Sequence, residues 1–362
     1  MENCLGIVAH DYLAICNSFC DQLTRSARGE ITSLPFVRNR LPKVSAVQPG
    51  EIFQVFVVGG TNCETARIRF NTQGGAAILE HTRCPEVAKF RTVDDFLDFI
   101  TAHVGVDARV IALNFGFALT PVASARGVLD GIMVGNDTKD HCFRGLVRQK
   151  VGAMIENHFR ITQGRKVTVC VGNDTVCLAL SAAARDIDPQ SMAAGVVGTG
   201  YNLALFLDEY TVVNIQACDF VSDDAPGISR KQLYRTEVSG GELYKRYNEL
   251  AEKYALGELD SSKDLAALAA SDKGNGGALA RALFERSASL VAAQLAGLYN
   301  FKGKPARLSV VMQGGVFWDG PGYKEMVRGR LDRLGIPSEA IAFKKVKHAD
   351  IVGAAKLATG GF

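Results

Sequence analysis

One stretch decides the fold of this 362-residue chain: residues 167–206, which read VTVCVGNDTVCLALSAAARDIDPQSMAAGVVGTGYNLALF. Its two apolar runs, at 167–171 and 193–197, are typical of short buried strands. Between them, the alanine-rich segment 176–184 predicts a helix. The order of strand, acidic loop, helix, strand, glycine turn and strand indicates an α/β fold.

Both loops of this stretch carry residues suited to chemistry. Asp174 follows the first predicted strand, where a rigid scaffold would hold its carboxylate in place for proton transfer. The turn Gly198-Thr199-Gly200 would let backbone N–H groups approach an anion closely, and the threonine hydroxyl adds a donor. Taken alone, the first loop is also typical of a helix cap and the second of a tight turn. Together they predict phosphoryl transfer to a hydroxyl.

The pair of loops resembles the hexokinase family of sugar kinases, within the actin-like ATPase superfamily, where Asn-Asp-Thr-Val is followed by Val-Gly-Thr-Gly-x-Asn. Three further segments occur here in the family's order: Gly59-Gly60-Thr61-Asn62, Thr138-Lys139 and Gln313-Gly314-Gly315. The resemblance spans about residues 50–357 and is closest in the central block. It implies an α/β, two-lobed actin-like ATPase (ribonuclease H-like) fold with a central cleft, and an ATP-dependent hexose kinase.

The resemblance also implies roles for individual residues. Asp174 would be the general base that accepts the proton of the sugar's primary hydroxyl. The implied sugar-binding residues are Thr120, Thr138, Lys139, Asn173, Asn214 and Gln216. The implied nucleotide-binding residues are Gly59, Gly60, Thr61, Asn62, Gly198, Thr199, Gly200, Gly314 and Gly315. The implied substrate is a hexose, and the implied cofactors are ATP and Mg²⁺.

Several positions depart from the family's pattern. Val57 stands where the family has an aspartate that supports Mg²⁺, and an apolar side chain cannot replace a hard oxygen ligand. Gln216 replaces a glutamate, which removes a charge-assisted bond to the sugar. Arg235 falls on another glutamate position, with Glu237 two residues away, and Glu64 replaces an arginine. These departures leave open a catalytically impaired relative that binds sugar or nucleotide as a sensor or regulatory partner.

The string Val-Gly-Asn-Asp-Thr occurs twice, at residues 134–138 and 171–175. The catalytic aspartate could therefore be Asp137 or Asp174. We favour Asp174, because it follows a buried strand and precedes a helix, whereas Asp137 lies in a polar loop.

Further predicted elements surround the central block. Helices are predicted at residues 8–25, 92–104, 143–158, 323–334 and 351–358, with a largely helical region at 226–300. Strands are predicted at residues 53–58, 65–70, 76–79, 110–113, 211–214, 308–312 and 340–343. We expect an N-terminal helix and connecting arm at 1–49, a small lobe at 50–172 plus 346–362, and a large lobe at 173–345.

Composition bounds the class of protein. The chain is 47% hydrophobic with a formal net charge of +3, so it can bury a large core and nothing calls for a nucleic-acid or membrane partner. The absence of a spanning apolar run and of a signal-peptide start predicts a cytoplasmic protein. The nine cysteines form no Cys-x-x-Cys and the six histidines no ligand motif, so we expect reduced thiols and no structural metal.

Overall fold

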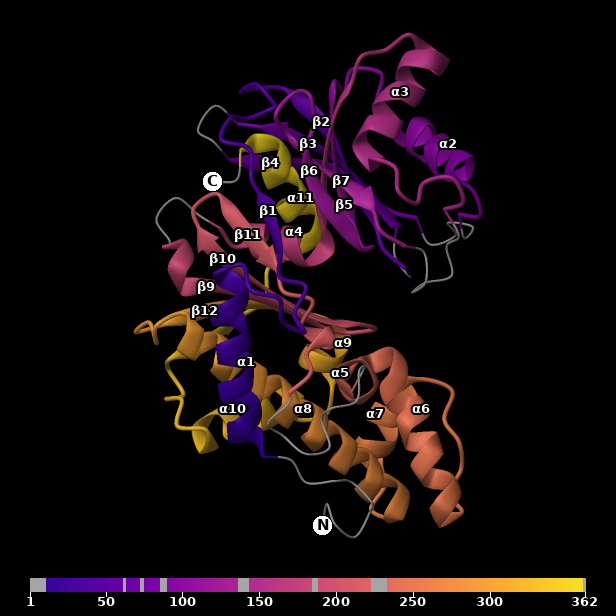
Figure 1. Ribbon diagram of the computed structural model, residues 1–362. Helices are drawn as coiled ribbons and strands as arrows, with labels where there is room; N and C mark the ends of the chain where they lie inside the picture. The colour runs from indigo at the N-terminus through magenta and orange to yellow at the C-terminus, as the bar shows by residue number, and fades with distance from the viewer. Residues whose placement is uncertain are drawn as a thin grey trace. The chain divides into compact units, whose positions relative to one another are not determined.

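The computed structural model describes residues 11–60, 63–71, 75–84, 90–135, 143–183, 188–222 and 233–360 (Figure 1). The chain forms two compact units. The first comprises Met1–Phe36, Ala193–Leu203 and Ile215–Lys345, and the second comprises Val37–Met192, Ala204–Asn214 and Val346–Phe362. Because the chain passes between them several times, neither unit is one continuous segment.

The second unit is built on a five-stranded sheet with the order β4-β3-β2-β5-β8. Its strands are β2 (Ile52–Val58), β3 (Cys63–Phe70), β4 (Ala76–Arg83), β5 (Val110–Phe115) and β8 (Thr168–Asn173). β2, β5 and β8 pair in parallel, whereas β3 pairs antiparallel with both β2 and β4. The carboxyl ends of the three parallel strands therefore meet at one edge of the sheet, where ligands of α/β proteins commonly bind.

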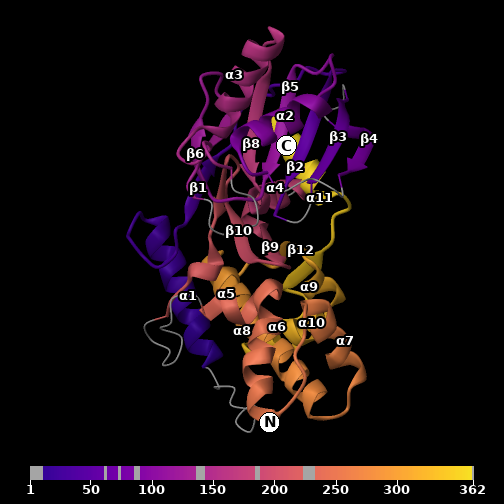
Figure 2. The ribbon, with the colours of Figure 1, turned by 90° about the vertical axis from the view of Figure 1, so that its right-hand side faces the viewer.

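Helices cover both faces of this sheet. Alternate strand residues, Phe56, Leu113 and Val171 among them, join a buried cluster with residues of α2 (Val93–His103) and α3 (Val151–Gln163). The other face is covered by α11 (Ala349–Thr359), which contacts β2, β5, β8 and α4 (Asp174–Ser181), as Figures 1 and 2 show. A Cβ on Gly353 would lie 1.8 Å from the Cys177 carbonyl oxygen, so only glycine lets α11 approach α4 this closely.

The first unit is organised around the long buried helix α8 (Asn275–Phe301). It packs against α1 (Tyr12–Ala27), α7 (Ser262–Ser271) and α10 (Tyr323–Arg333). The other elements are β9 (Met192–Val197), β10 (Tyr201–Asp208), α5 (Leu233–Val238), α6 (Gly240–Ala251), β12 (Leu308–Gln313), α9 (Gly315–Asp319) and β13 (Ile341–Lys344). The strand order in this unit is β10-β9-β12-β13. The chain leaves the first unit inside β10, and in the second unit the order is β1 (Val37–Arg40), β11 (Thr211–Asn214), β10.

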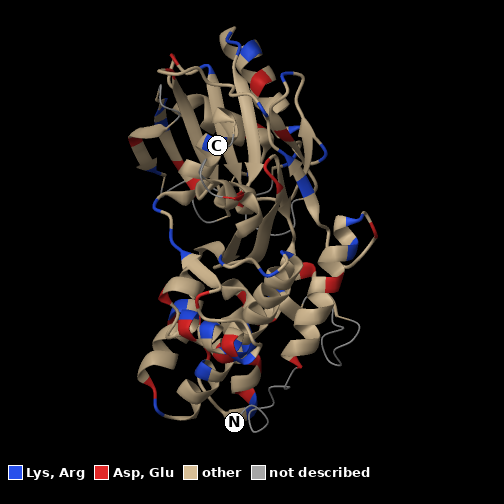
Figure 3. Ribbon diagram, turned by 90° about the vertical axis from the view of Figure 1, so that its left-hand side faces the viewer, with Lys and Arg blue, Asp and Glu red and all other residues tan. Residues whose placement is uncertain are grey.

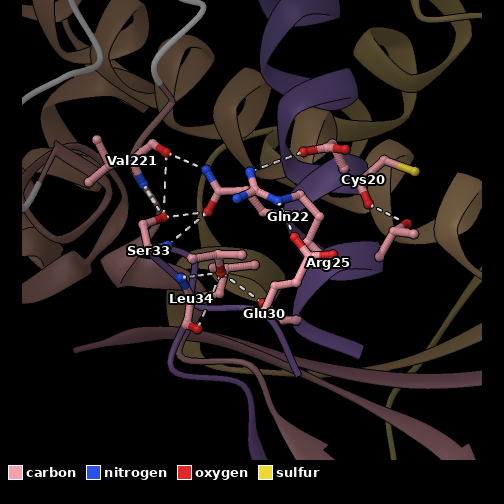
Figure 4. A network of polar contacts seen from close by, with 11 residues as sticks. Cys20, Gln22, Arg25, Glu30, Ser33, Leu34 and Val221 are labelled. Atoms are coloured by element: carbon pink, nitrogen blue, oxygen red, sulfur yellow. Dashed lines mark hydrogen bonds and ion pairs between the residues drawn. The ribbon is translucent and has the colours of Figure 1, made fainter. Parts of the chain in front are cut away.

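A polar network anchors the N-terminal helix α1 within the first unit (Figure 4). The Gln22 side chain donates to the Val221 carbonyl at 2.6 Å and accepts from the Ser33 hydroxyl at 2.6 Å. The same hydroxyl accepts from the Val221 N–H at 2.9 Å. Gln22 is buried, so these bonds are shielded from water. The helix predicted at 8–25 is confirmed, with packing and anchoring as its role.

The predicted connecting arm at residues 26–50 also contains a strand that the sequence pattern did not indicate. β1 (Val37–Arg40) pairs antiparallel with β11 (Thr211–Asn214). Only Asn39 of the four is buried, and its side chain donates to the Val37 carbonyl at 3.0 Å. A strand with two arginines and a buried asparagine lacks the apolar alternation on which the prediction depended.

Two further corrections concern residues 116–163. A hairpin of β6 (Leu119–Ala123) and β7 (Leu129–Met133) was not predicted, and the helix expected at 143–158 begins only at Val151. The Asp130 carboxylate of β7 fixes that start, because it accepts from the N–H groups of Gly152 at 2.7 Å and Ala153 at 3.2 Å. Burial raises the pKa of Asp130, while these backbone bonds oppose the increase.

Charged side chains of both signs are interspersed along the helices (Figure 3). The three parallel strands β2, β5 and β8 contain no lysine, arginine, aspartate or glutamate. In the part of the chain that the structure describes, no helix is long and apolar enough to cross a membrane. Within the same residues, no group of three or more histidine, cysteine, aspartate or glutamate side chains is placed to hold a metal ion.

Candidate active site

Asp174 lies at the carboxyl end of β8, as the first residue of α4. Its Oδ1 accepts from the Thr175 N–H at 2.7 Å and from the Thr175 hydroxyl at 3.1 Å. The residue is half-buried, and the positive end of the α4 dipole favours its negative charge. A carboxylate is therefore held in a defined place with part of its surface accessible.

The neighbouring Asn173 is the N-cap of α4, since its Oδ1 accepts from the Thr175 N–H at 3.1 Å. The same oxygen accepts from Asn214 Nδ2 at 2.8 Å, and Asn173 Nδ2 donates to the Phe117 carbonyl at 3.2 Å. Both asparagines are buried. These bonds bring together the ends of β8 and β11 and the segment after β5 beside Asp174, so two predicted sugar-binding residues are adjacent.

The remaining predicted sugar-binding residues are found in different parts of the chain. Thr120 is exposed on β6, where its backbone pairs with Ile132. Gln216 belongs to the first unit and adopts a left-handed conformation with φ +56°. The predicted residues Thr61, Asn62, Thr138 and Lys139, together with Asp137, lie outside the described residues.

Three glycine turns of the first unit meet backbone to backbone. Gly198 and Thr199 accept through their carbonyls from the N–H groups of Gly240 at 2.7 Å and Gly241 at 3.0 Å. A Cβ on Gly198 would lie 3.1 Å from the Gly314 Cα, and one on Gly314 only 2.2 Å from the Val197 carbonyl oxygen. Gly314 also has φ +106°.

The predicted nucleotide residues at 198–200 and 314–315 are thus neighbours. The turn at Ser239-Gly240-Gly241 falls in the region 226–300, which was predicted only to be largely helical. Its paired glycines were the signal that could have included it among the candidate site residues.

The surroundings of Val57 bear on how Mg²⁺ could be held. On β3, Glu64 pairs with Val57, but its carboxylate oxygens are engaged by His81 Nε2 at 2.8 Å and Arg83 Nε at 3.2 Å. On β5, Asn114 pairs with Val57, and its Nδ2 donates to Asp350 Oδ1 at 3.2 Å. Position 57 therefore has oxygen-bearing side chains on both sides, although it carries none itself.

The environment of Asn114 Oδ1 indicates whether this region could bind a cation. Asn114 is 1% exposed, and its Oδ1 has no hydrogen-bond partner among the residues that the structure describes. An orphaned buried carbonyl oxygen at the strand level of Val57 is a hard oxygen donor of the kind that Mg²⁺ accepts. The residues present therefore fit Mg²⁺, although the predicted ligand position is apolar.

The departures near residue 235 are not compensated by Glu237. That glutamate is 5% exposed and pairs with Arg286 Nε at 3.0 Å and Arg246 Nε at 3.3 Å. Arg235 Nη2 instead pairs with Asp219 at 3.2 Å. Both acidic groups are thus engaged by arginines of their own unit.

The pKa of the Cys177 thiol on α4 is affected by two carboxylates of this region, those of Asp350 and Asp174. Burial raises the pKa of its thiol well above the ordinary value, and the charges of Asp350 and Asp174 add to the increase. The thiol therefore stays protonated and is not a nucleophile. Asp350 is a residue that the sequence interpretation did not select; it stands immediately before the helix predicted at 351–358 and lies in the first turn of the observed α11.

The chain resembles known proteins in part of its sequence and in its fold. The family model described as hexokinase matches residues 244–359. No curated protein matches the sequence. Among solved structures, the hexokinase from Schistosoma mansoni complexed with glucose is 17% identical, with a TM-score of 0.74 over 96% of this chain and 95% of that chain.

Two bacterial structures match less closely. The ROK hexokinase from Thermus thermophilus is 18% identical, with a TM-score of 0.59 over 84% of this chain and 97% of that chain. The ROK family glucokinase from Streptomyces griseus, in complex with glucose and AMPPNP, is 17% identical, with a TM-score of 0.57 over 84% and 98%. These likenesses show the fold, which is that of the actin-like ATPases. The resemblance to the hexokinase family is therefore confirmed, by the family model over residues 244–359 and by the fold over nearly the whole chain.

Proposed function

We propose that the chain is an ATP-dependent hexose kinase in which Asp174 is the general base. The observation that carries this proposal is the placement of Asp174, a half-buried carboxylate fixed by Thr175 beside the buried Asn173–Asn214 pair. Its free oxygen would accept the proton of the primary hydroxyl as that oxygen attacks the γ-phosphorus. The bond from phosphorus to the β–γ bridging oxygen then breaks, and ADP leaves. A positioned base of this kind contributes about 10²–10⁴-fold in rate.

The remaining roles follow the same proposal. Asn173, Asn214, Thr120, Thr138, Lys139 and Gln216 would bind the hexose, and the glycine turns would meet ATP. Backbone contact at Gly240 and Gly314 leaves no room for a side chain, and the contact at Gly198 is tight; glycines of this kind suit close approach to a nucleotide. Mg²⁺ bound with ATP would neutralise charge on the phosphates. The described cysteines are free thiols, which supports a cytoplasmic setting.

The test is a coupled assay of ADP release over a panel of hexoses, with Asp174→Asn as the key variant. The variant keeps an oxygen to accept from Thr175 but cannot take a proton. We expect sugar-dependent ADP release in the natural protein and a loss of at least about 100-fold in kcat in the variant. Asp94→Asn is the matched control, because Asp94 is an exposed aspartate in the first turn of α2 and should not affect turnover.

A second candidate function is favoured by Val57 and by the buried ion pairs of Glu237. The family has a carboxylate at the positions of Val57 and Arg235, and neither position has an accessible acid here. A catalytically impaired relative would bind a sugar or nucleotide as a sensor or regulatory partner. Calorimetric titration with glucose and with Mg·ATP separates the two functions. Binding of either ligand without ADP release over the hexose panel would exclude the kinase and support the sensor.

A further inference from the structure

We propose that Arg83, held in place by Glu64, is a side chain of the second unit that binds the phosphate groups of ATP. This role rests on the proposed kinase function. Arg83 is the last residue of β4, and neither the sequence pattern nor the family resemblance selected it. With Arg83 beside it, Glu64 does not repel the phosphates, although the family has an arginine at the position of this acid.

Strand directions place Arg83 at the edge of the sheet that also carries Asp174. β3 is antiparallel to both β2 and β4, so β4 runs in the same direction as β2, β5 and β8. Arg83 ends β4, the outer strand next to β3, and Asp174 directly follows the end of β8 on the other side of the sheet (Figure 2). Ligands of α/β proteins commonly bind at the carboxyl ends of such strands. Arg83 therefore lies at the edge that is expected to face the nucleotide.

The register of the strands brings Arg83 close to the level of the predicted phosphate turn. Val57 of β2 pairs with Glu64 of β3, and Glu64 pairs with Arg83 of β4. Directly paired residues project their side chains from the same face of a sheet, so these three form one row across it. The turn Gly59-Gly60 begins two residues beyond Val57. A cation in this row is therefore near the point at which the turn leaves the sheet.

The Arg83 side chain leans across the sheet in the direction of β2. Its Nε donates to Glu64 Oε1 at 3.2 Å, so the guanidinium lies against a side chain of β3, the strand next to β2. The Glu64 side chain is only 11% exposed, and its other oxygen lies 2.8 Å from His81 Nε2. The Arg83 side chain is 77% exposed. A nearly buried carboxylate thus holds an accessible cation on the side of β4 that is nearer the turn.

The donors that Glu64 leaves unused suit a phosphate group. Among the residues that the structure describes, Glu64 is the hydrogen-bond partner of the Arg83 guanidinium, and it engages Nε. Nη1 and Nη2 therefore remain available. A guanidinium presents its N–H groups as a planar fork that binds phosphate oxygens in pairs, through charge-assisted hydrogen bonds. Because Arg83 offsets the charge of Glu64, the acid adds no net negative charge beside the phosphates.

The other arginines in the strands of this sheet are less suitable, and both are on β3. Arg67 donates Nη1 to Glu80 Oε1 at 3.2 Å and Nη2 to Asp107 Oδ2 at 2.8 Å, so its fork is occupied. Arg69 pairs with the first residue of β2 and therefore lies near the opposite edge of the sheet. Arg83 is the strand arginine that combines available donors with a place at the carboxyl edge.

The experiment separates phosphate binding from nucleotide binding in general. Mg·AMPPNP and adenosine, which has no phosphate, are titrated calorimetrically into the full chain for the natural protein, Arg83→Gln and Arg109→Gln. Arg109 is the matched control. Its Nε also donates to a glutamate, Glu51, at 3.2 Å, and its side chain is 69% exposed, but it precedes β5 at the opposite edge of the sheet. We expect Arg83→Gln to weaken Mg·AMPPNP binding about tenfold and to leave adenosine binding unchanged. Arg109→Gln should change neither.

A further variant, Glu64→Gln, tests the role of the acid. The amide keeps an oxygen that can accept from Arg83 but removes the negative charge. We expect Mg·AMPPNP to bind this variant at least as tightly as it binds the natural protein. Thermal melting of every variant establishes that it is folded.

The outcomes distinguish this role of Arg83 from the proposed function. If Arg83→Gln binds Mg·AMPPNP as tightly as Arg109→Gln does, Arg83 does not bind phosphate, and ADP release with a hexose would leave the kinase intact. Equal losses of affinity for Mg·AMPPNP and adenosine in Arg83→Gln would also overturn the inference, because they indicate a structural ion pair. A loss of Mg·AMPPNP affinity in Glu64→Gln as large as in Arg83→Gln would do the same.

Two further outcomes concern the kinase itself. A loss confined to Mg·AMPPNP in Arg83→Gln, when the natural protein shows no ADP release over the hexose panel, would support the phosphate contact and reject the kinase. Absence of Mg·AMPPNP binding by the natural protein would reject both.

Discussion

The two units build their candidate binding residues in different ways. In the second unit, the ends of β8 and β11 are joined by side chains, as in the bond from Asn214 to Asn173. In the first unit, the turns at Gly198, Gly240 and Gly314 are joined through the backbone. The chain can lose one side chain of a hydrogen-bonded network and still fold. Where two backbone segments touch, in contrast, a substitution that adds a side chain causes a steric clash. The contrast predicts where substitutions will unfold the chain and where they will alter only binding.

The largest effect is expected at a backbone contact. Gly314→Ala should lower the free energy of unfolding by about 3 kcal/mol or more, because its Cβ would lie 2.2 Å from the Val197 carbonyl oxygen at φ +106°. Gly303→Ala is the matched control. Gly303 has φ +76° but no atom of the described chain within 4 Å of its Cβ position, so only the backbone cost of about 1–2 kcal/mol applies.

Urea unfolding of the two variants measures the difference. Equal losses would mean that the turn at Gly314 can relax, and that the backbone contact is no more restrictive than an ordinary left-handed position.

A side-chain contact of the second unit should give the next largest effect, and it depends on pH. Lys356 of α11 donates to the Ala183 carbonyl, and burial lowers its pKa to about 8 from 10.5. Between those values the unfolded chain binds more protons than the folded chain, so the stability contributed by Lys356 rises with pH. It is greatest above pH 10.5 and is lost as the pH falls through about 8.

The difference in unfolding free energy between the natural protein and Lys356→Met should therefore change by about 2 kcal/mol between pH 7.5 and 10. This is less than the free energy that corresponds to the full pKa shift, because part of the Lys356 side chain is exposed to solvent. Other groups that titrate in this range cancel in the difference. A difference that stays constant with pH would show that Lys356 is charged normally in the folded chain.

The N-cap of α4 is expected to have a smaller effect on stability and a separate effect on activity. Asn173→Ala should cost about 1–2 kcal/mol, since it removes the oxygen that accepts from Thr175 and Asn214. It should also raise KM for the hexose if Asn173 binds the sugar. Thr92→Ala removes the cap of α2 at a similar cost and should leave KM unchanged. A KM that does not change in either variant would reduce Asn173 to a cap.

Local patterns account for what the sequence predicted. Asp174 and Asn173 could be placed because strand, loop and helix follow one another within a few residues, and the apolar runs of β2, β5 and β12 are equally local. β1, β6 and β7 were missed because arginine, proline and glycine interrupt their alternation. The contact of Asn114 with Asp350 joins residues 236 positions apart, so no spacing rule could reveal it.

Gly200 gives the smallest effect on stability and the sharpest test of the backbone turns. Unlike Gly198 and Gly314, it has no described atom within 4 Å of its Cβ position, and unlike Gly314 it does not have a positive φ. Packing therefore does not require glycine there. Gly200→Ala should leave the melting temperature unchanged but weaken Mg·ATP binding about tenfold, or about 1.4 kcal/mol, because the new methyl group would occupy the space in which the phosphates approach.

Gly329→Ala, which also meets open space, should leave Mg·ATP binding unchanged; because Gly329 lies inside α10, the alanine should raise the melting temperature. Calorimetric titration with Mg·ATP distinguishes the two variants. If Gly200→Ala binds Mg·ATP as tightly as Gly329→Ala does, the turn at 198–200 does not contact the nucleotide. The backbone contacts of the first unit would then be a matter of packing alone.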